Sequence, residues 1–382
     1  MKKIYMVVVC SSLVLSSITK AAPVSSKQIS YDKIVKFVEQ EKKQLSPVFP
    51  YRINLFTEGQ IIKNKYGTRI AEKATQFPSD NLGQFFYYDL LDQGMRVPHW
   101  HANAVEVGTV LTGKMRVTIW EGVGEKKVFT VNKNSTWTIP QAALHSLENV
   151  GKEKLSFVLA YNAPITADVQ FEQAWGFLPD AILAQSTGLT ENEIRSIKNS
   201  DVDRLSGFDP LAFPENTDLH SPYSSDFSTT EPIYHSELGS IIRIDSSNST
   251  KMQQMALQQT ILKPGTLRVP HWYTAGDTFL YISKGNGFFT MLDREGKAFH
   301  AMVKPGDLIY LPVATVHSFL NTGKDDLVTY EAFNVAKDIQ EISLLDGAQH
   351  LNKGAVSGAM GLNKTTVERL IQQKPRSYMV SF

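Results

Sequence analysis

The sequence predicts an all-β protein that contains two tandem antiparallel β-barrels with short flanking helices. The first observation behind this prediction is a succession of short strand-like runs, such as FFYYDLL, KKVFTV and KLSFVLAYN, separated by turn residues. The second is an internal repeat, because the pentapeptide RVPHW occurs at residues 96–100 and again at residues 268–272.

The repeat extends over most of the 382-residue chain. Several distinctive positions of the two halves keep one offset of 172 residues: His99 and His271, Gly113 and Gly285, Pro140 and Pro312, His145 and His317, and Asn149 and Asn321. Near the end of each half the offset grows by one, because Gly188 corresponds to Gly361. A period of this length indicates a duplicated domain rather than a solenoid repeat.

Residues 1–21 have the pattern of a secretory signal peptide. A basic MKKIY start precedes an apolar stretch, and Thr19-Lys20-Ala21 offers a cleavage site. The apolar stretch is short for a membrane span. We therefore expect a periplasmic or secreted protein with no membrane contact after cleavage. The chain's one cysteine, Cys10, lies in this segment, so we expect no disulfide in the mature protein.

The rest of the chain divides into an N-terminal extension (residues 22–50), a first barrel domain (51–207) and a second barrel domain (208–382). In the extension, residues 30–43 carry apolar side chains at helical spacing. We expect a short helix there, packed on the outside of a barrel.

A change in composition marks the end of the first barrel. Residues 171–200 are helical in composition, and Thr190 and Glu193 have the spacing of a capping box. Residues 206–222 are rich in Pro, Ser, Asn and Asp and form the best candidate linker. The formal net charge is +1 and no basic patch is present, so nucleic acid is not an expected partner.

The stretch RVPHWHANAVEVGTVLTG, residues 96–113, carries the chemistry. On a β-strand His99 and His101 point to one face, and Trp100 points to the other, where we expect it to join the core. Two imidazoles and the nearby carboxylate of Glu106 make most of a divalent-metal site. We expect the fourth ligand, His145, to come from a strand distant in sequence.

These residues resemble a known family. His101, Glu106 and Gly113 have the spacing of the first cupin motif. Pro140, His145 and Asn149 have the spacing of the second motif, in which Asn134 and Ala142 stand where glycines are usual. The PHWH sequence with a preceding arginine is most similar to bicupins of the oxalate decarboxylase and oxalate oxidase group. The resemblance covers about residues 51–382 and implies two cupin barrels of the double-stranded β-helix, or jelly-roll, type.

The resemblance also implies a cofactor and a substrate. Three imidazoles and one carboxylate leave two positions of an octahedron open, which suits Mn²⁺ or Fe²⁺. Relatives in this group use manganese, although Zn²⁺ and Cu²⁺ bind such ligands more tightly and an exported protein would meet them. In this group the arginine at the position of Arg96 is expected to hold the carboxylate of a small substrate through two parallel hydrogen bonds.

The repeat predicts that the second barrel has no complete metal site. His271 and His317 are retained, but Tyr273 replaces His101 and Thr278 replaces Glu106. Asp277 is shifted by one residue, which turns its side chain to the other face of a strand. We therefore expect one divalent metal per chain, in the first barrel. Trp272 is expected in the core, like Trp100.

One departure from the oxalate decarboxylase pattern concerns the proton donor. Relatives carry a glutamate in a Ser-Glu-Asn-Ser lid, and here the corresponding residues 166–169 contain no glutamate. Asp168 is the nearest acid, and Glu172 is a further candidate. Decarboxylation of oxalate, its oxidation, and action on another carboxylate therefore stay open.

Two further readings also stay open. A bicupin can serve as a ligand-binding or storage protein without catalysis, and a cupin metal site can belong to another enzyme class, such as a dioxygenase. The resemblance further implies a homo-oligomer, a trimer or a hexamer.

Overall fold

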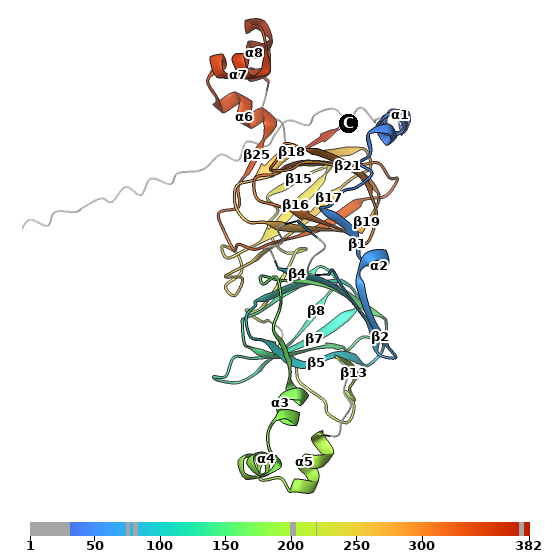
Figure 1. The fold of residues 1–382 in the computed structure, drawn as a ribbon, viewed down its shortest axis with the longest axis vertical. Helices are drawn as coiled ribbons and strands as arrows, with labels where there is room; N and C mark the ends of the chain where they lie inside the picture. Colours follow the sequence, from blue (N-terminus) through green and yellow to red (C-terminus); the bar gives the residue numbers. More distant parts are fainter. Residues whose placement is uncertain (1–30, 74–76, 79–82, 199–203, 219, 374–377) are drawn as a thin grey trace, which may run out of the picture.

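The computed structural model describes residues 31–382 except 74–76, 79–82, 199–203, 219 and 374–377, so the signal-peptide prediction lies outside the described residues. Figure 1 shows two β-barrels stacked along the long axis, with groups of helices at the two far ends. The predicted fold class, two tandem β-barrels with short helices, is confirmed. Within the described part of the chain, no helix is long and apolar enough to span a bilayer.

The first barrel, barrel 1, consists of two antiparallel sheets. In spatial order one sheet contains β14 (Ser224–Asp226), β9 (Ser135–Ile139), β6 (Glu106–Thr112), β11 (Leu155–Tyr161), β4 (Gln84–Leu90), β3 (Gly67–Ala71) and β2 (Gln60–Asn64). The other contains β12 (Asp168–Gln170), β5 (Gly94–His101), β10 (Leu144–Asn149), β7 (Lys114–Trp120) and β8 (Lys127–Asn132), with β13 (Leu205–Gly207) also paired to β5.

Barrel 2 repeats this arrangement. Its first sheet contains β1 (Arg52–Asn54), β22 (Asp307–Leu311), β19 (Thr278–Lys284), β24 (Leu327–Phe333), β17 (Ala256–Leu262), β16 (Gly239–Ile244) and β15 (Tyr234–Ser236). Its second contains β21 (Ala298–Val303), β20 (Gly287–Leu292), β23 (Val316–Asn321), β18 (Thr266–Tyr273) and β25 (Glu341–Ser343), with β26 (Met379–Ser381) paired to β18.

The two barrels exchange short strands. β1 pairs with β22 in barrel 2, where Asn54 Nδ2 donates to Asp307 Oδ1 at 2.8 Å. β14 pairs with β9 in barrel 1. The boundary between residues 207 and 208 places β1 in the first domain, although β1 pairs within barrel 2. It likewise places β14 in the second domain, although β14 pairs within barrel 1. The exchange had no local signal, because strands of three residues show too little alternation to reveal their partner.

A hydrophobic core joins the barrels. Buried side chains from both halves form one cluster, in which the rings of Phe85 and Tyr281 stack with centroids 5.5 Å apart. Phe77 and Phe279 lie in the same cluster, with centroids 6.0 Å apart. Burial of large aromatic surfaces stabilises the contact between the barrels, so the two halves share a core in addition to their own.

The N-terminal helix lies where the sequence predicts it. α1 (Tyr31–Glu41) is followed by a short 3₁₀ turn, Lys42–Gln44. The ring of Phe37 packs on Phe288 and Phe382 of barrel 2, with centroids 5.1 and 4.8 Å away. Ile34 is buried as well. The apolar face of this helix therefore covers the outside of a barrel, as expected.

The remaining helices form two arms at opposite ends of the molecule (Figure 1). They are α3 (Phe171–Phe177), α4 (Asp180–Thr187) and α5 (Glu191–Lys198) after barrel 1, and α6 (Leu344–His350), α7 (Lys353–Met360) and α8 (Lys364–Ile371) after barrel 2; α2 (Leu55–Glu58) is a single turn. The capping box is confirmed, because the N–H of Thr190 donates to Glu193 Oε2 and the N–H of Glu193 to Thr190 Oγ1.

The two tryptophans of the repeated PHW segment are not core residues. Trp100 and Trp272 are half-buried and lie on the outward faces of β5 and β18. Strand alternation holds at these positions, because the neighbouring histidines point inward. The prediction of a core position was wrong because the outer face of this sheet is only partly covered.

Two turns of the second motif store backbone strain. Ala142 has φ of +62° and its counterpart Ala314 has φ of +65°, in the left-handed region that favours glycine. Asn134 has φ of +71°, where barrel 2 has Gly306. The absence of the usual glycines at residues 134 and 142 therefore leaves the turn geometry intact, at a cost in stability.

We expect Ala142→Gly to raise the free energy of unfolding by about 1 kcal/mol, because glycine relieves the left-handed strain. Denaturant unfolding of the metal-free protein measures this change. The matched control is Ala181→Gly in α4, an exposed helical position where glycine should lower stability by about 0.5–1 kcal/mol. A loss of stability in Ala142→Gly would contradict the role of strain.

Candidate metal centre

Strand pairing assembles the four predicted ligands. β5 pairs antiparallel with β10 so that His99 lies opposite His145. Alternation along β5 turns His99 and His101 to the same, inward face. Glu106 is the first residue of β6, which belongs to the facing sheet. The site therefore lies inside barrel 1, between its two sheets.

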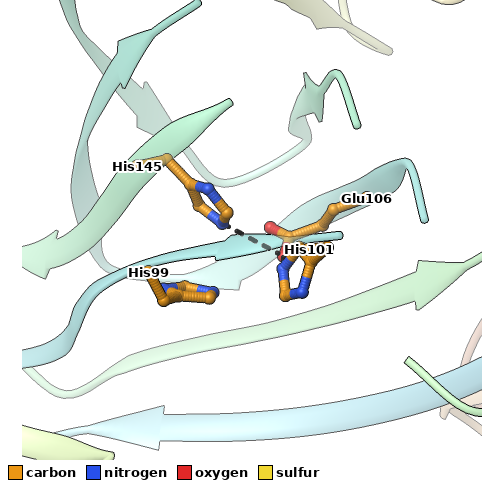
Figure 2. A group of neighbouring side chains, drawn as sticks. All are labelled: His99, His101, Glu106 and His145. Atoms are coloured by element: carbon orange, nitrogen blue, oxygen red, sulfur yellow. Dashed lines mark hydrogen bonds and ion pairs between the residues drawn. The ribbon is translucent and has the colours of Figure 1, made fainter. Parts of the chain in front are cut away.

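The four side chains converge on one point (Figure 2). The candidate ligand atoms of His99, His101, Glu106 and His145 all lie within 4.8 Å of one another. Each of these residues is at least 98% buried. Within the described ranges, this is the single group of three or more His, Cys, Asp or Glu side chains that comes so close together.

Backbone contacts orient two of the imidazoles. Nδ1 of His99 lies 2.7 Å from the carbonyl oxygen of Val97, and Nδ1 of His145 lies 2.9 Å from that of Ala143. Each Nδ1–H therefore donates to the backbone, which leaves a lone pair on Nε2. Neither Nε2 atom has a hydrogen-bond partner among the residues that the structure describes. Buried lone pairs of this kind fit a bound metal ion.

The carboxylate of Glu106 is held from several sides. Its Oε1 accepts a hydrogen bond from Trp137 Nε1 at 2.7 Å, and its Oε2 accepts one from the hydroxyl of Tyr161 at 3.0 Å. Nε2 of His101 lies 3.2 Å from the same Oε2, and Nε2 of His145 lies 3.6 Å from it. These contacts hold the carboxylate in a fixed orientation toward the imidazoles.

The protonation states suit a metal ion. Burial, reinforced by the charge of Arg96, holds the pKa of His99 well below its usual value. Burial also lowers the pKa of His101, although the hydrogen bond to Glu106 opposes this. Burial alone would raise the pKa of Glu106, but the neighbouring imidazoles of His101 and His145 outweigh it and the pKa is low. Neutral imidazoles and an ionised carboxylate are the forms that bind metal ions.

Arg96, the predicted carboxylate-binding residue, is fully buried beside the ligands. Its Nη2 donates to Asp168 Oδ2 at 2.5 Å, and Arg204 Nη1 donates to the same oxygen. Nε and Nη1 of Arg96 have no hydrogen-bond partner in the described part of the chain. Arg96 therefore keeps donors that can bind a ligand carboxylate.

The two candidate proton donors differ in their surroundings. Burial alone would raise the pKa of Asp168, but the charges of Arg96 and Arg204 outweigh it and hold the pKa low. The pKa of Glu172, in the first turn of α3, is raised, mainly by burial. Oε1 of Glu172 is buried without a hydrogen-bond partner among the described residues. The geometry therefore favours Asp168 as an ion-pair partner and Glu172 as an acid.

Barrel 2 has a different interior at the same place. His271 and His317 lie close together, with ring centroids 4.3 Å apart. The hydroxyl of Tyr273 donates to Glu331 Oε2 at 2.5 Å. Glu331 comes from β24, where barrel 1 has Leu159, and burial raises its pKa. The sequence did not identify this carboxyl, because it lies on a different strand from Glu106.

The shifted acid of barrel 2 points away from these histidines, as expected. Asp277 Oδ1 accepts a hydrogen bond from the N–H of Val313 at 2.7 Å, and Oδ2 accepts one from the hydroxyl of Tyr310 at 3.0 Å. The described residues of barrel 2 form no group of three or more potential ligands as close as that of barrel 1. This arrangement is consistent with one metal ion per chain.

Sequence reasoning missed the partners of the ligands. Trp137 and Tyr161, which hold Glu106, correspond to Ile309 and Phe333 in barrel 2. Barrel 2 has lost both hydrogen-bonding groups together with the glutamate. A comparison of the two repeats could therefore have identified them from the sequence. The sequence did not indicate the role of Arg204, because its contact with Asp168 depends on how the chain after helices α3–α5 returns to pair with β5.

Comparison with known proteins agrees with this architecture. Residues 53–195 and 225–368 each match the cupin family. The chain is 26% identical to oxalate decarboxylase OxdC of Bacillus subtilis (strain 168) over 291 residues, which cover 73% of this chain and 74% of that protein. A probable oxalate decarboxylase of Arthroderma benhamiae is 23% identical over 331 residues, which cover 83% of this chain and 80% of the relative.

A solved structure of the Bacillus subtilis oxalate decarboxylase, from work on the EPR parameters of its Mn(II) centres, has the same fold. It superposes with a TM-score of 0.76 and 20% sequence identity, over 95% of this chain and 98% of that one. The similarity therefore extends over both barrels.

Metal content tests the assignment of the site. We expect about one divalent ion per chain in the wild-type protein and close to none in Glu106→Gln, because the anionic ligand is lost. His271→Ala in barrel 2 should leave the metal content unchanged and is the matched control. Elemental analysis by mass spectrometry measures this, with circular dichroism to check folding. Loss of metal in His271→Ala would contradict a site confined to barrel 1.

The buried histidines predict an acid-sensitive metal-free protein. Burial lowers the pKa of His317 to about 4, and the pKa values of His99, His101 and His271 are also lowered. Below about pH 6.5 these histidines gain protons in the unfolded chain, whereas in the folded chain they stay neutral to a lower pH. Stability is therefore full above pH 6.5 and falls as the pH drops toward 4, by roughly 3 kcal/mol for His317 alone.

Urea unfolding of the metal-free protein between pH 7.5 and 4.5 measures this loss. The exposed His235 provides the control, because His235→Gln should leave the pH dependence unchanged. A free energy of unfolding that stays constant between pH 6.5 and 5 would contradict burial of neutral imidazoles.

Proposed function

Because this chain belongs to the cupin family and carries two cupin domains in tandem, we propose that it is a metalloenzyme that removes a carboxyl group from oxalate or a closely related small carboxylic acid. One observation carries this proposal: a buried set of three imidazoles and one carboxylate lies beside an arginine whose Nε and Nη1 have no partner among the described residues. The similarity to oxalate decarboxylases over most of the chain supports the choice of substrate.

The proposed metal is Mn²⁺, held by His99, His101, Glu106 and His145. The donor set favours a divalent ion that accepts both nitrogen and oxygen ligands. When bound, such an ion acts as a Lewis acid that polarises the carboxyl oxygens of the substrate. The proposal includes export, which rests only on the basic and apolar pattern of residues 1–21.

The role proposed for Arg96 is to bind and orient the substrate carboxylate. A guanidinium inside a protein forms strong charge-assisted hydrogen bonds, and its rigid geometry fixes the direction of a carboxylate. Asp168 and Arg204 keep this region electrically balanced, because Arg204 can neutralise Asp168 while Arg96 binds the substrate. The interior of barrel 1 also shields the reacting groups from bulk water.

The internal repeat separates a structural acid from a catalytic one. In barrel 2 Arg268 pairs with Glu341 as Arg96 pairs with Asp168 in barrel 1, although barrel 2 lacks the complete ligand set. The acid of each pair, Asp168 or Glu341, therefore serves the fold, because its ion pair holds β12 against β5 or β25 against β18. In contrast, the counterpart of Glu172 in barrel 2 is Leu345.

We therefore assign the proton-donating role to Glu172. The C–C bond of the substrate breaks and CO₂ leaves. The electron pair that stays on the other carbon takes the proton of Glu172, which gives formate when the substrate is oxalate. Water then returns a proton to the Glu172 carboxylate. A raised pKa suits this role, because the group must be protonated before it can donate.

Product analysis tests the function. We expect the manganese-loaded protein to convert oxalate to formate and CO₂. The control is Glu106→Gln, which should form neither product. Peroxide as the main product would replace decarboxylation by oxidation. A metal-loaded protein that leaves oxalate unchanged would overturn the proposal for this substrate.

Two variants distinguish the acids. We expect Glu172→Gln to lower the rate of formate production roughly 100-fold or more, which is the usual range for loss of a general acid. Asp168→Asn should keep most of the turnover and instead lower thermal stability, because it weakens two partly buried ion pairs. Formate production that survives in Glu172→Gln and is lost in Asp168→Asn would reverse the assignment.

A further inference from the structure

Gln170 departs from the usual sequence rule for a helix start. It is the N-cap residue of α3, and its side chain makes no capping hydrogen bond. Helices prefer Ser, Thr, Asp or Asn at this position. Barrel 2 follows the preference, because its counterpart Ser343 forms a capping box with Asp346 at the start of α6. Such departures from local rules are expected mainly at functional or strained sites.

The position of Gln170 explains the departure. β12 pairs with β5 so that Gln170 lies directly opposite His99. Residues directly opposite one another in an antiparallel pair share a face of the sheet, so this side chain is on the inward face with the metal ligands. Gln170 is 4% exposed. The side chain of Gln170, which is longer than that of its counterpart Ser343, therefore extends from the start of α3 into the barrel.

The amide of Gln170 is incompletely satisfied. Its Oε1 is buried and has no hydrogen-bond partner among the residues the structure describes. A buried acceptor without a donor destabilises a folded protein, so such groups are normally paired with protein, water or ligand. Close by on β5, Nε and Nη1 of Arg96 are buried donors without a partner in the described ranges. The interior thus offers donors for an anion together with an acceptor.

These two sets of unpaired atoms define the chemistry of a ligand. Arg96 requires a carboxylate, and Gln170 Oε1 requires a hydrogen-bond donor. A small molecule supplies both if it carries one ionised carboxyl group and, next to it, a protonated carboxyl or a hydroxyl group. Monoprotonated dicarboxylic acids and 2-hydroxy acids have this combination, whereas simple monocarboxylates lack the donor.

We propose that Gln170 is a specificity-determining residue that accepts a hydrogen bond from the second polar group of the substrate while Arg96 binds its carboxylate. This inference rests on the proposed function, because it places the substrate beside the metal ligands. It deepens that function by naming the form of the substrate, an acid with a neighbouring donor.

Binding of two probes to the metal-loaded protein tests the inference. Glycolate has a hydroxyl group next to its carboxylate, and acetate lacks it. Isothermal titration of wild type and Gln170→Met measures the ratio of the two affinities. We expect the preference for glycolate to fall about fivefold in the variant, the usual effect of one hydrogen bond. Glycolate can also chelate the metal, so the change in the ratio between the two proteins is the informative quantity.

A second variant separates specificity from structure. Gln170→Ser introduces the residue of barrel 2, which can cap α3. We expect its melting temperature to equal or exceed that of wild type, while the preference for glycolate falls as in Gln170→Met. Metal content should match wild type in both variants, because Gln170 is not among the ligands.

The outcomes separate this inference from the proposed function. If both variants keep the wild-type ratio, Gln170 does not contact the ligand and the inference is overturned. If the metal-loaded wild type binds neither glycolate nor acetate nor oxalate, the proposed function is overturned together with it. A lower melting temperature with an unchanged ratio would show that Gln170 has a purely structural role.

Discussion

The pairing of β5 with its neighbours is the constraint on which the site depends. β5 lies between β10 on one side and β12 on the other. Its inward side chains therefore share one face of the sheet with the inward side chains of both neighbours. One neighbour brings His145 opposite His99, and the other brings Gln170 opposite the same histidine. A shift of the register by one residue would turn every one of these side chains out of the barrel. Ligands and candidate substrate contacts are therefore fixed by the same hydrogen-bond ladder.

Burial then decides the charge of each group. A charged side chain inside a protein must be paired, because leaving water is costly. Glu106 stays ionised among imidazoles and hydrogen-bond donors, whereas Glu331 in barrel 2 lies beside Tyr273 and has a raised pKa. The Asp168 carboxylate is matched by two arginines. Barrel 1 is thus arranged to accept a cation and an anion together, whereas the carboxyl of barrel 2 is hydrogen-bonded to Tyr273 and has a raised pKa.

The duplication provides an internal comparison for each residue. Features present in both barrels, such as the acids Asp168 and Glu341 that pair with the neighbouring arginine, serve the common fold. Features found only in barrel 1 accompany its complete ligand set: a tryptophan and a tyrosine on the carboxylate, an acid at residue 172, and a glutamine instead of a capping serine at residue 170.

The sequence by itself determined the all-β class, the duplication and the four candidate metal-ligand positions, because strand alternation and a constant repeat offset are local, countable patterns. It also indicated that barrel 2 lacks two ligands. Only the tertiary structure decided that β1 and β14 cross between barrels, that Trp100 stays half-buried, and that Arg204 joins Asp168. These features depend on which distant surfaces meet, and short strands or single charged side chains carry no periodic signal that names their partner.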